Sequence, residues 1–593
     1  MSRKADALAG ARLALFLVSV STAAWAVSTT RHGALAVVIL ALGVAFFLML
    51  VVYHARVRDA VMHARAAQEL NVRGSARVRR AWSALPNPGE SVPAEHSYAG
   101  DLDVAGTSAS LFRLLDVVSA ATGRPALLRW LLSDSATTGE LRDRQAAVAE
   151  LSSSTAFRED LARVAGQAPD VAPERFEHFL SWAENADDAW AAHSPGMVWA
   201  GRIIPLVTLA TTVLAFFRWL PWSAPALSIV AGLLLLARLR GAVSGSLTSA
   251  LTHATGLRVQ RRMLEQVAAA SFTAPLLRAR RDSAAAGIEG LRALERLLAL
   301  VEGRGSLIHA IVNTLALWDV HAVTRLDRWR RRYGRRLRDC LAALGDVEAL
   351  AALGMLAHDN PAWRFPELDE HADRLTAVAL GHPLLPAATR VANDVTVGPP
   401  GTLLLVTGSN MSGKSTLLRA IGLNVVLAQA GAPVCAERLT MPLVEVRTSI
   451  RLADSLERGV SLFMAELERL KEIVDAARET ARPRPLLYLL DEILHGTNTA
   501  ERLIAARAVL GHLVRAGAIG AVTTHDLTLA ADGALAAASQ PVHFTEQVTT
   551  GNGDVASAMT FDYRLRPGLA TSTNALKLLA LVGLAEAPRH NKA

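Results

Sequence analysis

Two long apolar stretches open the chain. Residues Leu13–Thr30 form the first, and Ala34–Tyr53 form the second, which runs for twenty residues without a charged side chain. About twenty apolar residues in a helix cross the roughly 30 Å hydrocarbon core of a bilayer. The short link Arg31-His32-Gly33 joins the two stretches, so residues 1–58 are predicted to form a transmembrane hairpin.

Basic residues on both sides of this hairpin indicate its orientation. Arg3 and Lys4 precede it, and His54, Arg56 and Arg58 follow it. Since basic residues favour the cytoplasmic side, both flanks are predicted to be cytoplasmic, which makes this a multi-pass protein of the cell (inner) membrane.

A cleaved secretory signal is the alternative, because Ala24-Trp25-Ala26 resembles a small-residue cleavage site. The second apolar stretch argues against it. So does the chemistry of the C-terminal region described below, which is cytoplasmic in kind.

Helical periodicity dominates the middle of the chain. A basic helix and a linker containing Pro86, Pro88 and Gly89 occupy residues 59–99, and residues 100–374 read as helices. The spacing of Leu111 and Leu115 is typical of a packed helix face.

A second apolar pair interrupts this helical region at about residues 199–240. Its segments are 203–217 and 222–237, with Arg202, Arg238 and Arg240 at its edges. We interpret the pair as a second transmembrane hairpin. Each segment is short, so a re-entrant or buried hairpin stays an open alternative.

The densest basic stretch is 325–336, RLDRWRRRYGRR. It fits either phosphate contacts with nucleic acid or lipid headgroups, or a solvated helix face, and the pattern favours neither.

An apolar strand, a glycine-rich loop and a helix follow one another in the C-terminal region, which predicts an α/β domain over residues 375–593. The strand is Leu403–Val406 and the loop reads GSNMSGKST. In this context G-x-x-x-x-G-K-[ST] is typical of a phosphate-binding loop, whose backbone amides point at phosphate oxygens. The predicted nucleotide-binding residues are Gly408, Ser409, Asn410, Met411, Ser412, Gly413, Lys414, Ser415 and Thr416.

Two carboxylates follow a second apolar strand, 485–490. Ligands gather at the carboxyl ends of parallel strands, so Asp491 and Glu492 are expected beside the glycine-rich loop. Lys414 is predicted to reach the β- and γ-phosphates, Ser415 and Asp491 to hold Mg²⁺, and Glu492 to act as general base. The sequence therefore predicts an ATPase that uses ATP and Mg²⁺.

Composition adds three constraints. The 593 residues are 51% hydrophobic with a mean hydropathy of +0.27, which fits exposure of part of the chain to lipid. A net charge of +8 is compatible with nucleic acid or with an anionic membrane face. The two cysteines, Cys340 and Cys435, form neither a disulfide framework nor a metal-binding spacing.

Four blocks in this domain resemble the ATPase domain of the MutS mismatch-repair family. They are 408–416 (GSNMSGKST), 461–466 (SLFMAE), 490–499 (LDEILHGTNT) and 523–526 (TTHD). The resemblance extends over roughly residues 375–585 and implies an ABC-type P-loop ATPase.

The resemblance also implies roles and partners. Ser461 matches the signature serine, which acts across an interface between two ATPase domains, so the chain is expected to be a homodimer. His525 matches the histidine that senses the γ-phosphate.

A weaker resemblance to the family's helical lever domain lies at 110–148. The space before it is too short for the family's mismatch-reading and connector domains. We interpret the second apolar hairpin as standing where the family inserts its DNA clamp.

Three functions remain open from the sequence. The first is a membrane-anchored MutS-like ATPase that binds mismatched, branched or damaged DNA. The second is a mechanical ATPase that acts on a membrane partner or lipid and has lost DNA binding. The third, an ABC transporter, ranks lowest because four short spans leave little room for a pathway. The expected fold is an α/β P-loop (ABC-type) ATPase domain preceded by an all-α lever-like domain, with transmembrane helical hairpins.

Overall fold

The computed structural model describes most of the chain. The described residues are 33–87, 96–117, 122–167, 173–185, 195–252, 254–301, 304, 306–409, 411–451, 462–479, 483–494, 499–531, 533–548 and 559–569, with Val18, Ser21, Thr22 and Trp25. Most of the first predicted membrane segment, Leu13–Thr30, lies outside them.

The chain divides into two compact units, Met1–Ala76 and Arg77–Ala593. Helix α2 (Gly33–Arg79, 47 residues) makes up most of the described part of the first unit. It joins the predicted apolar segment and the following basic segment into one helix, since no proline interrupts residues 34–79. Val38, Leu42, Phe46 and Met49 on α2 are exposed.

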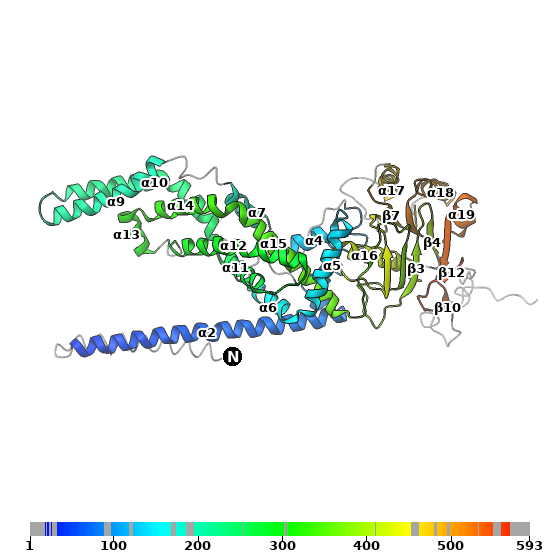
Figure 1. Ribbon diagram of the computed structural model, residues 1–593, viewed down its shortest axis with the longest axis horizontal. Coiled ribbons are helices and arrows are strands. Elements are labelled where there is room, and N and C mark those ends of the chain that lie inside the picture. Colours follow the sequence, from blue (N-terminus) through cyan, green and yellow to red (C-terminus); the bar gives the residue numbers. More distant parts are fainter. Residues whose placement is uncertain are drawn as a thin grey trace, which may run out of the picture. The chain divides into compact units, whose positions relative to one another are not determined.

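Helices form the first part of the second unit (Figure 1). Their bounds are η1 (Trp82–Ala84), α3 (Leu111–Leu115), α4 (Gly123–Leu132), α5 (Thr138–Ser153), α6 (Thr155–Ala165), α7 (Pro173–Glu184), α9 (Pro195–Phe216), α10 (Ser223–Thr252), α11 (Ala254–Ala269), α12 (Pro275–Ala299), α13 (Leu307–Ala316), α14 (Trp318–Trp329), the π-helical turn η3 (Arg330–Gly334) and α15 (Arg335–Asp359).

Helix α15 is the core of this helical region and packs against α4, α5 and α12. The continuous run Trp318–Asp359 is long and apolar enough to cross a membrane, yet 83% of its most apolar window is buried inside the protein. The apolar character of α15 therefore serves packing.

The basic stretch 325–336 divides into two parts. Arg330 is buried, and its guanidinium donates hydrogen bonds to the backbone oxygens of Trp182 and Asn185 at the end of α7. These bonds satisfy carbonyls that a helix end leaves unpaired. The exposed residues are Arg325, Arg328, Arg331, Arg332, Arg335 and Arg336.

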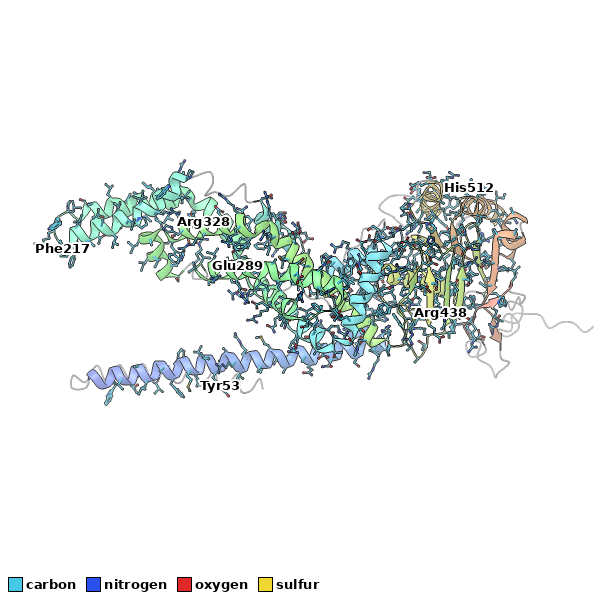
Figure 2. The ribbon with its side chains drawn as sticks, in the orientation of Figure 1. Tyr53, Phe217, Glu289, Arg328, Arg438 and His512 are labelled. Carbon is cyan, nitrogen blue, oxygen red and sulfur yellow. The ribbon has the colours of Figure 1, made fainter. Side chains whose placement is uncertain are left out.

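Helices α9 and α10 form an antiparallel hairpin that carries exposed apolar side chains, with Phe217 at its turn (Figure 2). Both helices are long and apolar enough to cross a membrane. The hydroxyls of Thr208, Thr211 and Thr212 donate to carbonyls four residues earlier, at 2.6 to 2.9 Å. Their polar groups are thus satisfied within the helix.

The α/β domain contains two larger sheets. A six-stranded sheet has the order β12-β9-β4-β8-β7-β6, parallel except for β12, and a four-stranded sheet has the order β1-β5-β2-β3. The strands are β1 (Glu367–Leu368), β2 (Leu375–Leu380), β3 (Asn393–Val397), β4 (Leu403–Thr407), β5 (Arg438–Met441), β6 (Glu445–Ser449), β7 (Leu486–Asp491), β8 (Ile519–Thr524), β9 (Ser539–His543), β10 (Glu546–Val548), β11 (Met559–Phe561) and β12 (Arg566–Pro567). The helices are α16 (Lys414–Ala430), α17 (Leu462–Arg478), α18 (Thr499–Arg515), η4 (Leu527–Ala531) and α19 (Gly533–Ala538).

Alternation along the central strands builds a core on each face of the larger sheet. Leu404 and Val406 pack in the same core as Leu418 of α16, whereas Leu403 and Leu405 pack in the core of α17 and α18. The α/β class predicted from the sequence is confirmed. The sheet holds the loop after β4 beside the ends of β7 and β8.

The junction of η3 and α15 lies so close to α7 that it requires a glycine. A Cβ at Gly334 would lie 2.0 Å from the Ala183 backbone oxygen. Gly334→Ala is therefore expected to lower the free energy of unfolding by about 1–3 kcal/mol or more, measured by denaturant unfolding in detergent. Gly139→Ala on α5 is the matched control, because a Cβ there meets nothing within 4 Å. Equal effects of the two substitutions would contradict this packing.

Candidate functional site

A glycine-rich loop connects β4 to α16. Gly408 has a φ of +144° and Gly413 a φ of +103°, backbone conformations that L side chains rarely adopt. Met411 also has a positive φ, of +70°. Asn410 lies outside the described residues. The motif spacing thus reflects backbone turns that glycine permits.

Lys414 begins α16, and its side chain is only 4% exposed. Its ammonium donates to the backbone oxygens of Gly408 (2.9 Å) and Ser409 (3.1 Å). It also lies 3.4 Å from Oε1 of Glu492. A buried cation is costly without such partners, so the loop and Glu492 together hold the ammonium in place.

Asp491 is the last residue of β7 and Glu492 follows it, as predicted from the apolar run. The Thr523 hydroxyl donates to Asp491, and the Glu492 amide donates to the Thr523 backbone oxygen at 3.2 Å. Glu492 has a φ of +47°, a conformation that costs energy for a non-glycine residue and clusters at functional sites. Nδ1 of His525, after β8, lies 3.8 Å from Oε2 of Glu492.

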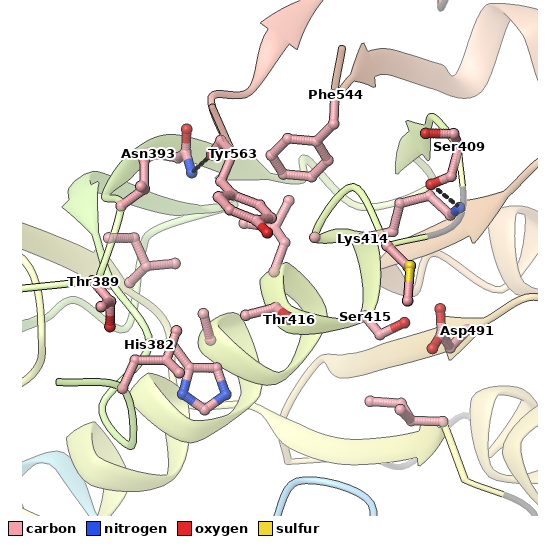
Figure 3. Close-up of a pocket in the computed structure, with 18 of the residues that line it drawn as sticks. His382, Thr389, Asn393, Ser409, Lys414, Ser415, Thr416, Asp491, Phe544 and Tyr563 are labelled. Atoms are coloured by element: carbon pink, nitrogen blue, oxygen red, sulfur yellow. Dashed lines mark hydrogen bonds between the residues drawn. The ribbon is translucent and has the colours of Figure 1, made fainter. Parts of the chain in front are cut away.

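A cavity of about 820 Å³ opens above the loop. Figure 3 shows Ser409, Lys414, Ser415 and Asp491 at one end and His382, Thr389 and Asn393 at the other. The polar end carries the predicted site residues. The apolar residues Leu380, Leu385 and Val391 also line the cavity.

Tyr563 and Phe544 also line the cavity and were not among the predicted site residues. The ring of Tyr563 covers the loop, because a Cβ at Gly413 would lie 3.1 Å from its Cδ1. Asn393 holds this segment, donating to the Tyr563 backbone oxygen (3.0 Å) and accepting from the Leu565 amide (2.7 Å). Tyr563 lies 150 residues beyond Gly413 in the sequence, so no local pattern could reveal the contact.

His382 is buried at the cavity wall and was not among the predicted site residues. Burial, and then the charges of Arg419 and Arg390, lower the pKa of His382 to about 4. Its ring is therefore neutral near pH 7. Nδ1 accepts a hydrogen bond from the Leu384 amide at 3.2 Å, which fixes the ring against the wall.

Ser461 and residues 495–498 lie outside the described residues, although helix α17 begins at Leu462. Glu466 of α17 is buried and accepts from the Leu494 amide at 2.5 Å. This contact ties the segment after Ser461 to the segment after Glu492.

The site suits an anionic group with a hard cation. Ser412 Oγ is buried and has no hydrogen-bond partner within the described part of the chain, so the loop holds a polar atom that a ligand can satisfy. Ser415 and Asp491, whose side chains carry oxygen atoms that can coordinate a hard cation, line the same end of the cavity. The described residues hold no cluster of three or more His, Cys, Asp or Glu that could bind a metal by itself. A cation here would need further ligands from the anion or from water.

Comparison with known proteins gives a match to the same domain. Residues 404–590 match the family model described as MutS domain V. The chain is 36% identical over 267 residues to the DNA mismatch repair protein MutS of Azorhizobium caulinodans, which is 42% of this chain and 27% of that protein.

Two archaeal relatives match a similar part. The DNA mismatch repair protein MutS 1 of Halobacterium salinarum is 35% identical over 265 residues, 43% of this chain and 29% of that protein. The DNA mismatch repair protein MutS 2 of Haloarcula marismortui is 39% identical over 186 residues, 31% of this chain and 18% of that protein. The matched part thus spans less than a third of each relative's length. The C-terminal α/β domain of this chain is therefore similar to MutS domain V, the ATPase domain of the MutS family.

Proposed function

We propose that this protein is a Mg²⁺-dependent P-loop ATPase of the ABC type. The observation that carries the proposal is the buried Lys414 ammonium, 3.4 Å from Glu492, below a cavity of about 820 Å³ in a domain that matches MutS domain V. A triphosphate fits the polar end, since backbone amides, a helix N-terminus and a lysine converge there. The base fits the other end, beside His382, Thr389 and Asn393.

Each site residue has a proposed task. The γ-phosphate competes with Glu492 for Lys414, and its arrival frees the carboxylate to orient the attacking water. His525, 3.8 Å from Glu492, contacts the γ-phosphate or the water. Mg²⁺ neutralises phosphate charge when bound, with Ser415 and Asp491 as its protein-side contacts.

The proposed active form is a homodimer through the ATPase domains. One such domain is present in the chain, and Ser461 of a second copy would complete the γ-phosphate site.

The names of the relatives support a proposed role in mismatch repair on DNA. The net charge of +8 and the exposed arginines of 325–336 support binding to a polyanion.

The proposed setting is the cell membrane, with the ATPase domain in the cytoplasm. Support comes from the exposed apolar side chains of α2 and of the α9–α10 hairpin. Trp199, Trp219 and Trp222 are exposed near the ends of that hairpin, where interfacial aromatic residues stand. Helix α13 contacts the hairpin and adds exposed Ile311, Val312 and Leu315.

The proposed domain division follows from this setting. It comprises an anchor (1–58), a basic helix and linker (59–99), a lever-like domain (100–374) with the second hairpin, and the ATPase domain (375–593).

The alternative function is a mechanical ATPase that acts on a membrane partner or lipid without DNA. The exposed apolar surface favours this alternative.

The first prediction from this proposed function concerns ATP hydrolysis. Glu492→Gln is expected to lower kcat by about 10²–10⁴-fold, because the neutral amide cannot accept the water proton. Nucleotide affinity should stay equal or rise, because the carboxylate that competes for Lys414 is gone. ATPase assays and equilibrium nucleotide binding measure both quantities, with Glu468→Gln on an exposed position of α17 as control. Unchanged turnover in Glu492→Gln would contradict the assigned base.

A second prediction concerns DNA. Branched or mismatched DNA is expected to stimulate the ATPase of nanodisc-held protein at low salt, and high salt should abolish the stimulation by weakening phosphate contacts. The measurement is the ATPase rate with homoduplex, mismatched and branched DNA. Rates that ignore every DNA tested would reject the DNA function in favour of the membrane function.

A third prediction concerns the second hairpin. Cys340 and Cys435 are buried, so an introduced cysteine gives a specific label. Phe217→Cys at the turn is expected to react with an impermeant maleimide added outside spheroplasts, whereas Ser153→Cys on α5 should react only after lysis. Protection of residue 217 until lysis would mean that the hairpin does not span the membrane.

A further inference from the structure

The segment before the helical region is fastened to the α/β domain by a buried carboxylate. Residues 97–103, here called the strap, have the sequence SYAGDLD and follow the linker that leaves η1. The Ser97 backbone oxygen accepts from the amide of Thr448 at 3.1 Å. The strap thus lies against the end of β6, about 350 residues away in the sequence.

Asp101 is the centre of this contact, with a side chain that is 4% exposed. Its Oδ2 accepts from the Thr448 hydroxyl (2.8 Å) and the Ile450 amide (2.9 Å), and its Oδ1 accepts from the Arg451 amide (3.2 Å). Arg469 of α17 lies 3.3 Å from Oδ2. One carboxylate therefore satisfies two successive amides where the chain leaves the sheet.

Leu102 and Asp103 extend the contact to the helix that follows the glycine-rich loop. Leu102 is fully buried against Gly422 of α16, where a Cβ would lie 2.6 Å from both of its methyl groups. Asp103 forms a two-bond ion pair with the Arg451 guanidinium. Arg419 of α16 donates to the Asp101 backbone oxygen at 3.1 Å.

The strap joins two regions that must work together if the site hydrolyses ATP. On one side, Ile450 lines the cavity and α16 carries Lys414. On the other side, the amides of Leu111 and Phe112 at the start of α3 donate to the backbone oxygens of Asp103 and Val104, each at 2.8 Å. The Tyr98 hydroxyl donates to the Leu131 backbone oxygen in α4 at 3.0 Å.

We propose that the strap couples the nucleotide site to the helical region, with Asp101 as the positioning residue that holds the backbone after β6. This rests on the proposed ATPase function. Because Asp101 and Leu102 contact β6 and α16 at once, a shift of either element on nucleotide binding moves α3 and α4 with it. Coupling of this kind is reciprocal, so the helical region also sets the geometry of the site.

Asp101→Asn separates coupling from folding. Asparagine keeps the volume but has one acceptor oxygen, so one of the two amides faces an NH₂ group. Asp103→Asn is the matched control. The Asp103 carboxylate contacts the side chains of Arg451 and Arg419, and it does not accept from the amides of Ile450 and Arg451. Hydrogen exchange of residues 97–132 and 445–451 is measured with and without Mg²⁺ and a non-hydrolysable ATP analogue, alongside analogue affinity, kcat and KM.

In the wild-type protein the analogue is expected to slow exchange in the strap, α3 and α4. The Asp101→Asn variant should lose this response, and its kcat should fall about tenfold while KM and analogue affinity change little. The Asp103→Asn variant should keep the response. If Asp101 only stabilised the fold, Asp101→Asn would lower the free energy of unfolding and would not lower kcat at an unchanged KM. If Asp101→Asn does not fold, Thr448→Val is used, which removes one hydroxyl bond to Asp101.

Three results would overturn the proposal, and they can be told apart. An analogue that binds the wild-type protein without changing exchange in 97–132 would leave the ATPase proposal intact and reject coupling through the strap. A wild-type protein that binds no analogue would reject both. An Asp101→Asn protein that keeps the full response and kcat would reject Asp101 as the positioning residue.

Discussion

A lysine that is almost fully withdrawn from water needs fixed partners, and that need organises the C-terminal domain. The Lys414 ammonium contacts two carbonyls of its own loop and the carboxylate of Glu492. Those partners come from different strands, so the contact exists only because β4, β8 and β7 lie side by side in parallel register. Glu492 also adopts a left-handed backbone conformation, which the bond from its amide to Thr523 supports.

The same requirement reaches beyond the sheet. Helix α16 begins at Lys414, and eight residues later Gly422 leaves the notch that Leu102 fills. A side chain at this position of α16 would push the strap away from the sheet. The glycine-rich loop and the helical region are thus joined through α16, which has a lysine at its start and a glycine, Gly422, in its middle.

Sequence reasoning succeeded where the determining residues are neighbours in the chain. The strand 403–406, the loop glycines and the carboxylates after 485–490 each carry a local pattern, and the α/β class followed from them. It missed the contacts that only the fold creates. Asp101 and Thr448 are separated by 347 residues, and Asn393 and Tyr563 by 170. Composition also misleads at Arg330, which belongs to the densest basic stretch yet closes the end of α7 as a buried structural residue.

The core helix has a consequence for how the protein is made. The run Trp318–Asp359 is as apolar as α2, α9 and α10, so it is a fourth candidate span within the described residues. Its own charges oppose insertion. Asp346, paired with Arg129 and Arg280, and the buried Glu348 stand within the apolar part, where a carboxylate at the centre of a bilayer costs several kcal/mol. The arginines of 325–336 stand immediately before that part and favour its retention in the cytoplasm. Two acidic side chains and the basic residues before them thus oppose membrane insertion of α15, which is buried in the protein interior.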